Sequence, residues 1–213
     1  MNRSTKRDVS NAPLPVANRG RVLRTAGREK GFVIIIETPR LRLRPWIDAD
    51  VAPFIAMMTD PEVTRHVSPA TIPRASAEAA ATHYRLQLET NGYGWWPIDV
   101  KDGASFAGVI MLDQVKFKAA FTPAIEVGWL LPRERWGSRY ATEGARAALH
   151  HAFITMELSE VVALTAASNI PSQRAMQRLG MTHDPTFRAA TADDLLQRAV
   201  RTWTRGEGND RLK

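Results

Sequence analysis

The sequence predicts one α/β (α+β) domain with a mixed, mostly antiparallel central sheet flanked by helices. Short apolar or alternating segments typical of strands are interspersed with segments of helical period. Their order is strand, two helices, three strands, helix, strand, helix, which is typical of a mixed sheet with helices packed on it. The 213 residues, of which 44% are hydrophobic and 24% charged, suit a single globular domain. We place this domain at residues 32–205.

The first half of the domain combines one strand region with two helices. Residues 32–46 begin with an apolar run and continue with leucines alternating with arginines, which indicates strand. Asp48 or Asp50 is positioned to cap the helix that follows. Residues 76–88 repeat Ala, Tyr and Leu at four-residue spacing, which predicts a second helix.

The second half is richer in strands. A turn at residues 101–103 joins two predicted strands within residues 92–117. No strand pair is evident after Asp184, and residues 192–203 have a helical pattern. The remaining predictions are a strand at 124–131, a helix at 142–156, a strand at 160–165 and a helix at 169–179.

Both ends of the chain, residues 1–31 and 206–213, are predicted to be disordered. Residues 1–31 hold eight Lys or Arg against two acidic residues, so they carry +6 of the formal net charge of +7. A basic arm of this kind can bind nucleic acid. Because the segment has no aromatic residue for base stacking, we favour a solvated extension and do not expect nucleic acid as a partner.

The composition excludes several kinds of site. The chain has no cysteine, which rules out disulfides, thiolate metal sites and a cysteine nucleophile. No group of His, Asp and Glu has the spacing of metal ligands, so no metal is expected. No apolar run approaches the roughly 18 residues of a membrane span, and the N-terminus lacks the apolar core of a secretory signal. We therefore expect a cytoplasmic protein that has no membrane partner.

Residues 125–149 form the segment with the clearest chemical meaning. A predicted strand leads through a short basic loop into a helix that begins near Ala141. Helix N-termini expose unpaired N–H groups and carry partial positive charge, so the geometry suits a phosphate or pyrophosphate. Gly137 allows the backbone to approach such a ligand, and Arg133, Arg135 and Arg139 add positive charge. An ordinary strand–turn–helix connection with solvated arginines remains the alternative.

Residues 165–181 form a second candidate segment. A strand ends, Asn169 is positioned to cap the next helix, and Ser172 falls in the first turn of that helix. Polar side chains between a strand end and a helix start often contact substrate in α/β sheets. Considered alone, the two residues are better explained as a helix cap and a first-turn serine.

Taken together, these segments resemble the GNAT superfamily of N-acetyltransferases, and within it the branch of the ribosomal-protein N-terminal acetyltransferases RimJ and RimL. Four blocks carry the resemblance in order along residues 36–184: IETPRLRLRPW, TDPEVTRHV, EVGWLLPRERWGSRYATEGARAAL and ASNIPSQRAMQRLGMTHD. The resemblance implies a GNAT-like sheet that is splayed where acetyl-CoA binds, with acetyl-CoA as the co-substrate.

The resemblance also implies individual roles. The backbone of Trp129, Leu130 and Leu131 lines the pantetheine arm, Asn169 touches that arm, and Ser172 lies near the thiol. The pyrophosphate is held by backbone N–H groups of Trp136, Gly137, Ser138, Arg139, Tyr140, Ala141 and Thr142.

Three departures from the family pattern stand out. Arg139 occupies a position that is usually glycine, so it is either strained by a positive φ or adds a phosphate contact. Met176 stands where many members outside this branch have a tyrosine acid, which favours Ser172 as the proton donor. The two closing strands of the family, often with a late tryptophan, are not evident after Asp184.

The implied reaction is direct attack of a neutral amine on the thioester carbonyl in a ternary complex. Glu126 lies on the strand that meets the co-substrate and is the best-placed base, directly or through water. An ordinary surface carboxylate is the alternative for Glu126. Ser172 is the candidate to protonate the leaving thiolate, with His66 and His183 as alternatives.

The acceptor side is less defined. Trp95 and Trp96 lie in a strand that faces the expected acceptor pocket, although one residue of an alternating pair is expected in the core. We predict an N-acetyltransferase that acts on a primary amine, of a protein N-terminus or a small molecule, as a monomer or homodimer. Two alternatives remain open: a non-catalytic acyl-CoA-binding domain, and a ribosome- or RNA-associated protein that uses the basic arm.

Overall fold

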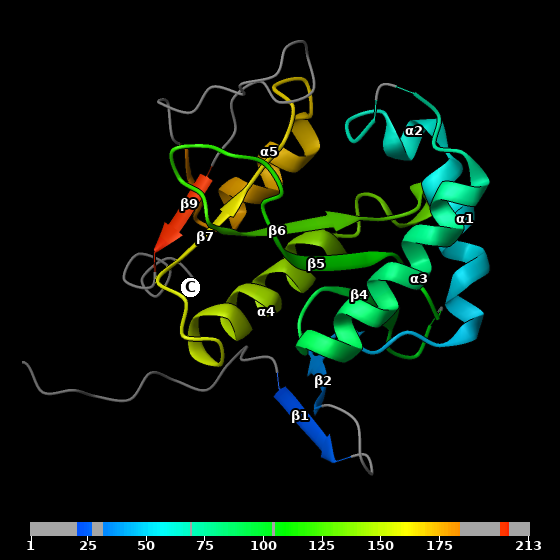
Figure 1. Cartoon of the computed structure of the whole chain (residues 1–213), viewed down its shortest axis with the longest axis horizontal. Helices are drawn as coiled ribbons and strands as arrows, with labels where there is room; N and C mark the ends of the chain where they lie inside the picture. The colour runs from blue at the N-terminus through cyan, green and yellow to red at the C-terminus, as the bar shows by residue number, and fades with distance from the viewer. Residues whose placement is uncertain (1–20, 27–31, 69, 104, 184–200, 205–213) are drawn as a thin grey trace, which may run out of the picture.

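The computed structural model describes residues 21–26, 32–68, 70–103, 105–183 and 201–204. Within these residues, nine strands form one sheet in the order β1-β2-β3-β4-β5-β6-β7-β9-β8 (Figure 1). Neighbouring strands are antiparallel except β6 and β7, which are parallel, so the predicted fold class is confirmed. The strands are β1 (Arg21–Ala26), β2 (Phe32–Glu37), β3 (Leu41–Leu43), β4 (Trp95–Val100), β5 (Val109–Gln114), β6 (Ile125–Leu130), β7 (Glu160–Ala163), β8 (Thr182–His183) and β9 (Arg201–Thr204).

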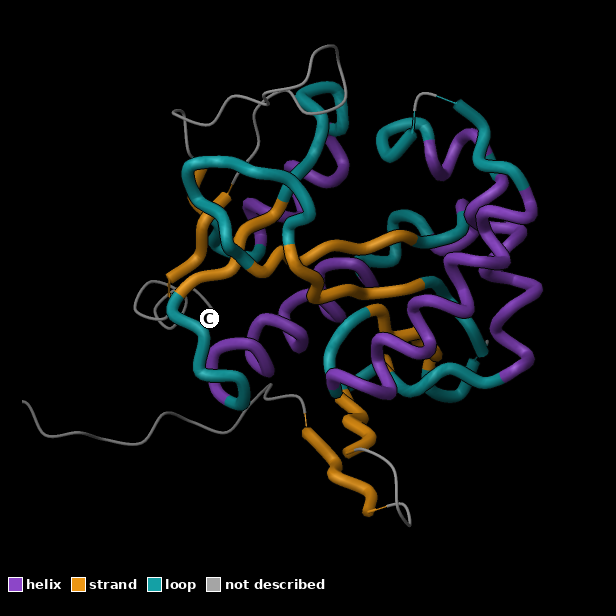
Figure 2. Tube along the Cα trace, viewed as in Figure 1, coloured by secondary structure: helices purple, strands orange, loops and turns teal. Residues whose placement is uncertain are grey.

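Helices cover both faces of the sheet (Figure 2). On one face, α1 and α3 pack against each other, and the other face is covered by the long helix α4 (Figure 1). The helices are η1 (Asp48–Asp50), α1 (Val51–Thr59), α2 (Pro61–Thr64), α3 (Arg74–Asn91), η2 (Arg133–Arg135), α4 (Tyr140–Ile154) and α5 (Ile170–Arg178). No helix of the described residues is long and apolar enough to cross a bilayer.

Two adjacent tryptophans of β4 show how the faces are divided. Trp95 stacks on Tyr84 of α3, with ring centroids 4.2 Å apart, whereas Trp96 meets His151 of α4 edge-on. Successive side chains of a strand point to opposite faces, so α3 and α4 lie on opposite sides of the sheet. At Gly144 of α4, an added Cβ would lie 2.7 Å from a side-chain carbon of β5, so the glycine permits the close packing of this helix.

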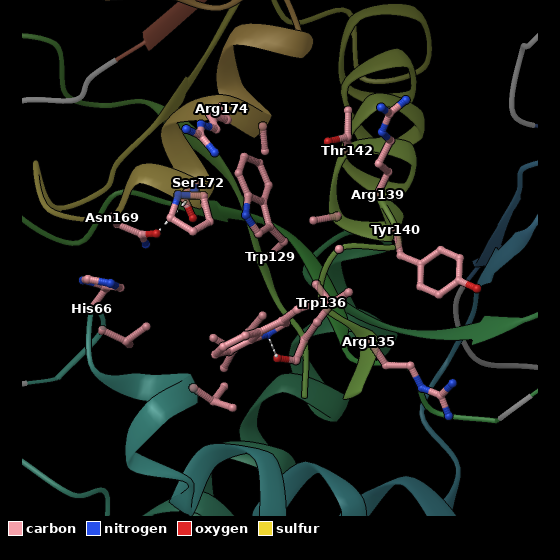
Figure 3. Close-up of a pocket in the computed structure, with 18 of the residues that line it drawn as sticks. His66, Trp129, Arg135, Trp136, Arg139, Tyr140, Thr142, Asn169, Ser172 and Arg174 are labelled. Atoms are coloured by element: carbon pink, nitrogen blue, oxygen red, sulfur yellow. Dashed lines mark hydrogen bonds between the residues drawn. The ribbon is translucent and has the colours of Figure 1, made fainter. Parts of the chain in front are cut away.

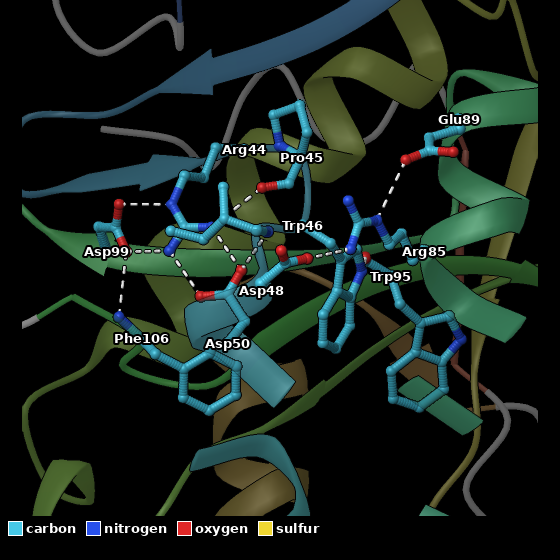
Figure 4. Close-up of polar contacts among 11 residues, drawn as sticks. Arg44, Pro45, Trp46, Asp48, Asp50, Arg85, Glu89, Trp95, Asp99 and Phe106 are labelled. Carbon is cyan, nitrogen blue, oxygen red and sulfur yellow. Dashed lines mark hydrogen bonds and ion pairs between the residues drawn. The ribbon is translucent and has the colours of Figure 1, made fainter. Parts of the chain in front are cut away.

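An ion-paired network ties β3 and β4 to η1, the short helix that precedes α1 (Figure 4). Arg44, just after β3, donates to Asp50 of η1 at 2.7 and 2.8 Å and to Asp99 of β4 at 2.6 and 2.8 Å. Asp99 also accepts from the backbone N–H of Phe106 at 3.0 Å. The hydrogen bond to Asp50, and then that to Asp99, raises the pKa of Arg44 against the effect of its burial. The network therefore fixes η1 relative to β3 and β4.

The ends of the chain differ from the sequence predictions. β1 lies inside residues 1–31, where we predicted disorder, and pairs with β2 along six residues. β9 includes Trp203, which we predicted to be helical, and pairs with both β7 and β8. The chain therefore has the two closing strands, β8 and β9. They leave no local pattern in the sequence, because β8 has only two residues and β9 pairs with the distant β7. Residues 1–20, 27–31, 184–200 and 205–213 lie outside the described residues.

Replacing Arg44 with methionine is expected to destabilise the fold, because Asp50 and Asp99 lose their shared cation. The free energy of unfolding, measured by urea denaturation, should fall by about 3 kcal/mol. Arg42→Met is the matched control, since Arg42 pairs with Glu37 at a half-exposed position. Its loss should stay below about 1 kcal/mol. Equal losses in the two variants would contradict a structural role for the Arg44 network.

Candidate active site

The site begins where β6 and β7 separate. A single residue pair, Glu126 opposite Val162, joins the two strands. On its other edge, β6 pairs with β5 along its whole length from Ile125 to Leu130. Beyond Glu126, the backbone of β6 and of Leu131 therefore has no neighbouring strand on the β7 side within the described residues. An extended ligand can occupy such an edge as an additional strand does.

A pocket of about 580 Å³ opens at this separation (Figure 3). The end of β6, the start of α4 and the start of α5 form three of its walls, and α2 with the residues that follow it forms the fourth. The lining is drawn from residues 62–67, 129–131, 135–142 and 169–178. It contains every residue that the sequence analysis assigned to acetyl-CoA except Ser138.

The loop between η2 and α4 is shaped by two residues with positive φ. Gly137 has φ +77°, and an added Cβ there would meet nothing within 4 Å. Glycine at this position is thus explained by backbone conformation and not by lack of space. Arg139 has φ +62° and adopts the left-handed conformation, which costs about 1 kcal/mol for a residue with a Cβ. Of the two alternatives that the sequence left open for Arg139, the structure therefore shows the strained backbone with positive φ.

The N-terminus of α4 has no side-chain cap. Arg139, the N-cap residue, makes no capping hydrogen bond. Glu143, the acidic residue of the first turn, is instead held by the hydroxyl of Thr38 at 2.6 Å and by the backbone and side chain of Arg40 at 2.9 and 2.6 Å. The first N–H groups of α4 therefore keep their partial positive charge for a ligand, and an anion such as a pyrophosphate fits them.

Positive charge gathers around the same pocket. Arg135, Arg139, Arg174 and Arg178 line it, and no ion pair joins any of them to an acidic group in the described part of the chain. The single carboxylate among the lining residues is Glu62, which pairs with a neighbouring arginine at 3.2 Å. Four arginines without acidic partners match a ligand that carries several phosphate charges.

The start of α5 brings polar groups to the opposite wall. Asn169 caps the helix as predicted, accepting from the backbone N–H of Ser172 at 3.3 Å. Across the pocket, the ring of His66 points toward this wall, and its Nδ1 lies 3.5 Å from the hydroxyl of Ser168 (Figure 3). Burial, and then the charge of a neighbouring arginine, lowers the pKa of His66. His183 lies on β8 and is not among the pocket's lining residues.

Glu126 lies at the closed end of the separation, beside the pocket and not in its lining. Its side chain accepts no hydrogen bond from the described residues. Burial, and then the negative charge of Asp113, raises the pKa of Glu126 to about 7, against the opposing charge of Lys116. A half-buried carboxyl group that titrates near neutral pH can accept a proton under physiological conditions.

The two candidate acceptor-pocket tryptophans have different environments. Trp96 is fully buried on the α4 face, so it belongs to the core. Trp95 is half-buried on the α3 face, and its indole N–H donates to Asp113 at 3.3 Å. Since Asp113 stands opposite Glu126 in the sheet register, Trp95 is the tryptophan that lies on the same face as Glu126.

Sequence reasoning missed two parts of the site. The wall formed by α2 and the residues after it was overlooked except for His66, although the block TDPEVTRHV carries part of the family resemblance. Arg174 and Arg178 were also overlooked, and their four-residue spacing on one helix face was the available signal. Arg133, expected to add charge at the loop, instead pairs with Asp60 at 2.9 Å.

Comparisons with known proteins agree with this geometry. The profile of the Acetyltransferase (GNAT) domain family matches residues 40–182. The Bacillus subtilis protein YkkB is 30% identical over 156 residues, which are 71% of this chain and 87% of YkkB. The Aspergillus fumigatus FsC-acetyl coenzyme A-N(2)-transacetylase is 31% identical over 71% of this chain and 66% of that enzyme.

Solved structures show the same fold. An acetyltransferase from Agrobacterium tumefaciens strain C58 superposes with a TM-score of 0.67 at 27% identity, covering 84% of this chain and all of that one. Mycobacterium smegmatis RimJ in complex with CoA-disulfide superposes with a TM-score of 0.61 at 18% identity, covering 83% and 84% of the two chains. The chain belongs to the GNAT family and is an acetyltransferase that uses acetyl-CoA.

Introducing a carboxylate at Gly137 is expected to weaken acetyl-CoA binding, because the negative charge would stand where the phosphates bind. The dissociation constant, measured by calorimetric titration, should rise by about tenfold or more in Gly137→Asp. Gly137→Asn is the matched control, since asparagine has the same shape as aspartate, carries no charge and tolerates a positive φ. Equal affinities in the two variants would mean that the pyrophosphate does not lie at this loop.

Proposed function

We propose that the protein is an N-acetyltransferase that moves the acetyl group of acetyl-CoA to a primary amine, on a protein N-terminus or a small molecule, by direct attack in a ternary complex. The observation that carries this proposal is the position of Glu126. A carboxyl group with a pKa of about 7 and no hydrogen-bond partner among the described residues lies where β6 and β7 separate, beside a pocket suited to CoA. This is the place where an amine needs a base.

Binding is assigned to the residues that form the pocket. The backbone edge at residues 129–131 pairs with the amides of the pantetheine arm, and Asn169 contacts the same arm. The carbonyl of Leu131 within this edge already accepts from the indole N–H of Trp136 at 2.8 Å. The first turn of α4 and the loop before it, from Trp136 to Thr142, hold the pyrophosphate. The arginines around the pocket offset its charge. When bound, the co-substrate supplies an activated thioester carbonyl.

Glu126 is proposed as the base. The incoming amine forms the new C–N bond as the C–S bond breaks, and Glu126 accepts the proton that the amine loses. Glu126 does not line the pocket, so a water molecule relays this proton or the acceptor itself reaches the carboxylate. A pKa of about 7 makes the group an effective base at neutral pH, because roughly half of it is ionised there.

Ser172 is proposed as the proton donor. It lies in the first turn of α5 and lines the pocket, facing the free edge of β6 (Figure 3). Its hydroxyl donates a proton to the leaving sulfur and regains one from solvent. His66 lines the opposite wall and is the second candidate for this role, whereas His183 is not among the lining residues.

A nitrogen acceptor is supported by the relatives. The printed name of the Aspergillus enzyme specifies transfer to an N(2) nitrogen. The resemblance of four sequence blocks to the RimJ and RimL branch, together with the shared fold of RimJ, supports a place near that branch. Trp95 and Tyr84, stacked on the face that carries Glu126, are proposed as the apolar wall of the acceptor site.

The absence of cysteine makes the reaction simple to follow. A thiol reagent added during turnover detects only the CoA that is released, since the protein has no thiol. Purified protein should bind acetyl-CoA and release CoA with at least one member of a panel of N-terminal peptides and alkylamines. Binding without acetyl transfer to any amine of the panel would contradict the proposed reaction.

Replacing Glu126 with glutamine is expected to lower kcat by about 10²- to 10⁴-fold, the usual contribution of a general base. The affinity for acetyl-CoA should change little, because Glu126 does not line the pocket. Steady-state kinetics and calorimetry separate the two effects. Glu160→Gln, at an exposed position at the start of β7, is the matched control and should keep wild-type turnover.

The same carboxyl group makes the pH profile predictable. Since the base acts when ionised, the ratio of wild-type to Glu126→Gln kcat/KM should rise about tenfold per pH unit below pH 7 and level off above it, because ionisation of the acceptor amine affects both proteins alike.

The folding stability should change with pH in the opposite direction. The pKa of Glu126 lies near 7 in the native state and near 4.5 in the unfolded state, so stability falls as pH rises between those values. Glu126→Gln should therefore be at least as stable as wild type at pH 8. A variant that unfolds there would overturn this account.

Ser172→Ala is expected to lower kcat by about tenfold while leaving the dissociation constant of acetyl-CoA within about twofold. The backbone N–H of residue 172 still donates to Asn169 in this variant, so the start of α5 is retained. Ser159→Ala, at an exposed serine before β7, serves as the control. Unchanged turnover in Ser172→Ala would remove Ser172 from the reaction and favour His66.

A further inference from the structure

Asp113 is a buried carboxylate that stands directly opposite Glu126. Asp113 lies on β5 and pairs in antiparallel register with Glu126 on β6. Directly opposed residues share one face of the sheet, so the two side chains are neighbours. Asp113 is only 6% exposed. Like charges placed opposite each other are ordinarily destabilising, which makes this pair unusual for a purely structural arrangement.

The carboxylate of Asp113 is fixed by donors from several elements. One oxygen accepts from Gln87 of α3 at 2.7 Å, from the backbone N–H of Gln114 at 2.7 Å and from Lys116 at 3.0 Å. The other accepts from the indole N–H of Trp95 on β4 at 3.3 Å. With four donors, the group cannot turn away from Glu126 without breaking hydrogen bonds in a buried setting.

Glu126, in contrast, accepts no hydrogen bond from the described residues. The charged or titratable groups that face it are Asp113 on β5, Lys116 just after β5 and Tyr84 on α3. Burial, together with the charges of Asp113 and Glu126, raises the pKa of Tyr84, so its phenol stays neutral. From β7, the residue paired with Glu126 is the uncharged Val162. Asp113 is thus the nearest fixed negative charge.

We propose that Asp113 is a positioning residue for acetyl transfer, whose locked negative charge tunes the proton affinity of Glu126 and so sets the pH range in which the amine is acetylated. This inference rests on the proposed role of Glu126 as base. Asp113 does not line the pocket and acts through Glu126. Its bond to the indole N–H also holds Trp95 on the acceptor face, so one carboxylate organises both the base and the aromatic wall.

The balance of opposing charges supports this role. After burial, Asp113 is the next cause that raises the pKa of Glu126, and Lys116 lowers it. The Lys116 side chain is 65% exposed, so solvent weakens its effect, whereas Asp113 is enclosed. Removal of the Asp113 charge should therefore lower the pKa of Glu126, and removal of the Lys116 charge should raise it.

The test is a carbon-13 NMR titration of the Glu126 carboxyl group in the full chain, assigned with Glu126→Gln. In Asp113→Asn, the pKa of Glu126 should fall by about one unit, and the midpoint of the kcat/KM profile should move with it. In Lys116→Gln, both should rise. Asp48→Asn removes a carboxylate whose side chain is 93% exposed and should move neither.

Each outcome has a distinct meaning. A folded Asp113→Asn variant with an unchanged Glu126 pKa overturns the inference, and so does an unchanged pKa in Lys116→Gln if the first variant fails to fold. If the Glu126 pKa moves but the activity profile does not, the two charges are coupled but Glu126 is not the base. That result overturns the proposed mechanism and leaves Asp113 without a part in the reaction.

Discussion

The separation of β6 from β7 is the constraint on which the rest of the site depends. The two strands meet through one residue pair, Glu126 and Val162, and the edge of β6 beyond that pair has no strand beside it. Unpaired backbone groups in a partly buried position are costly unless a ligand or water satisfies them. The other edge of β6 is paired with β5 along its whole length, and Gly144 allows α4 to pack closely on β5.

Several groups around the opening adopt arrangements that lower the stability of the fold. The first turn of α4 lacks a side-chain cap, and Arg139 accepts a left-handed conformation before it. Glu126 is half-buried, has no hydrogen-bond partner among the described residues and stands opposite a second carboxylate. Each feature would be removed by selection for stability alone, and each is explained if the place is reserved for an anionic co-substrate and for proton transfer. Buried networks such as that of Arg44 hold the surrounding fold in place.

The sequence predicts the parts of this protein that have a local signature. The helices, the turn after β4 and the Asn169 cap follow from periodicity and capping, and the CoA segments follow from motif resemblance. The sheet register that brings Asp113 opposite Glu126 has no such signature, because it depends on residues paired across two strands. For the same reason, β9 was mistaken for helix: it pairs with β7, which is distant in the sequence, and with β8, which has only two residues. Likewise, Trp95 and Trp96 are equivalent in sequence, and only the packing of α3 and α4 separates them.

Hydrogen–deuterium exchange with and without acetyl-CoA tests the central claim most directly. If the co-substrate completes the open edge of β6, added acetyl-CoA should slow exchange at residues 129–131. It should also slow exchange at the amides from 137 to 142, in the loop before α4 and the start of that helix. The amides of β5, already paired with β6, should change little. Protection confined to other parts of the chain, or saturating binding that leaves both segments unprotected, would contradict the account.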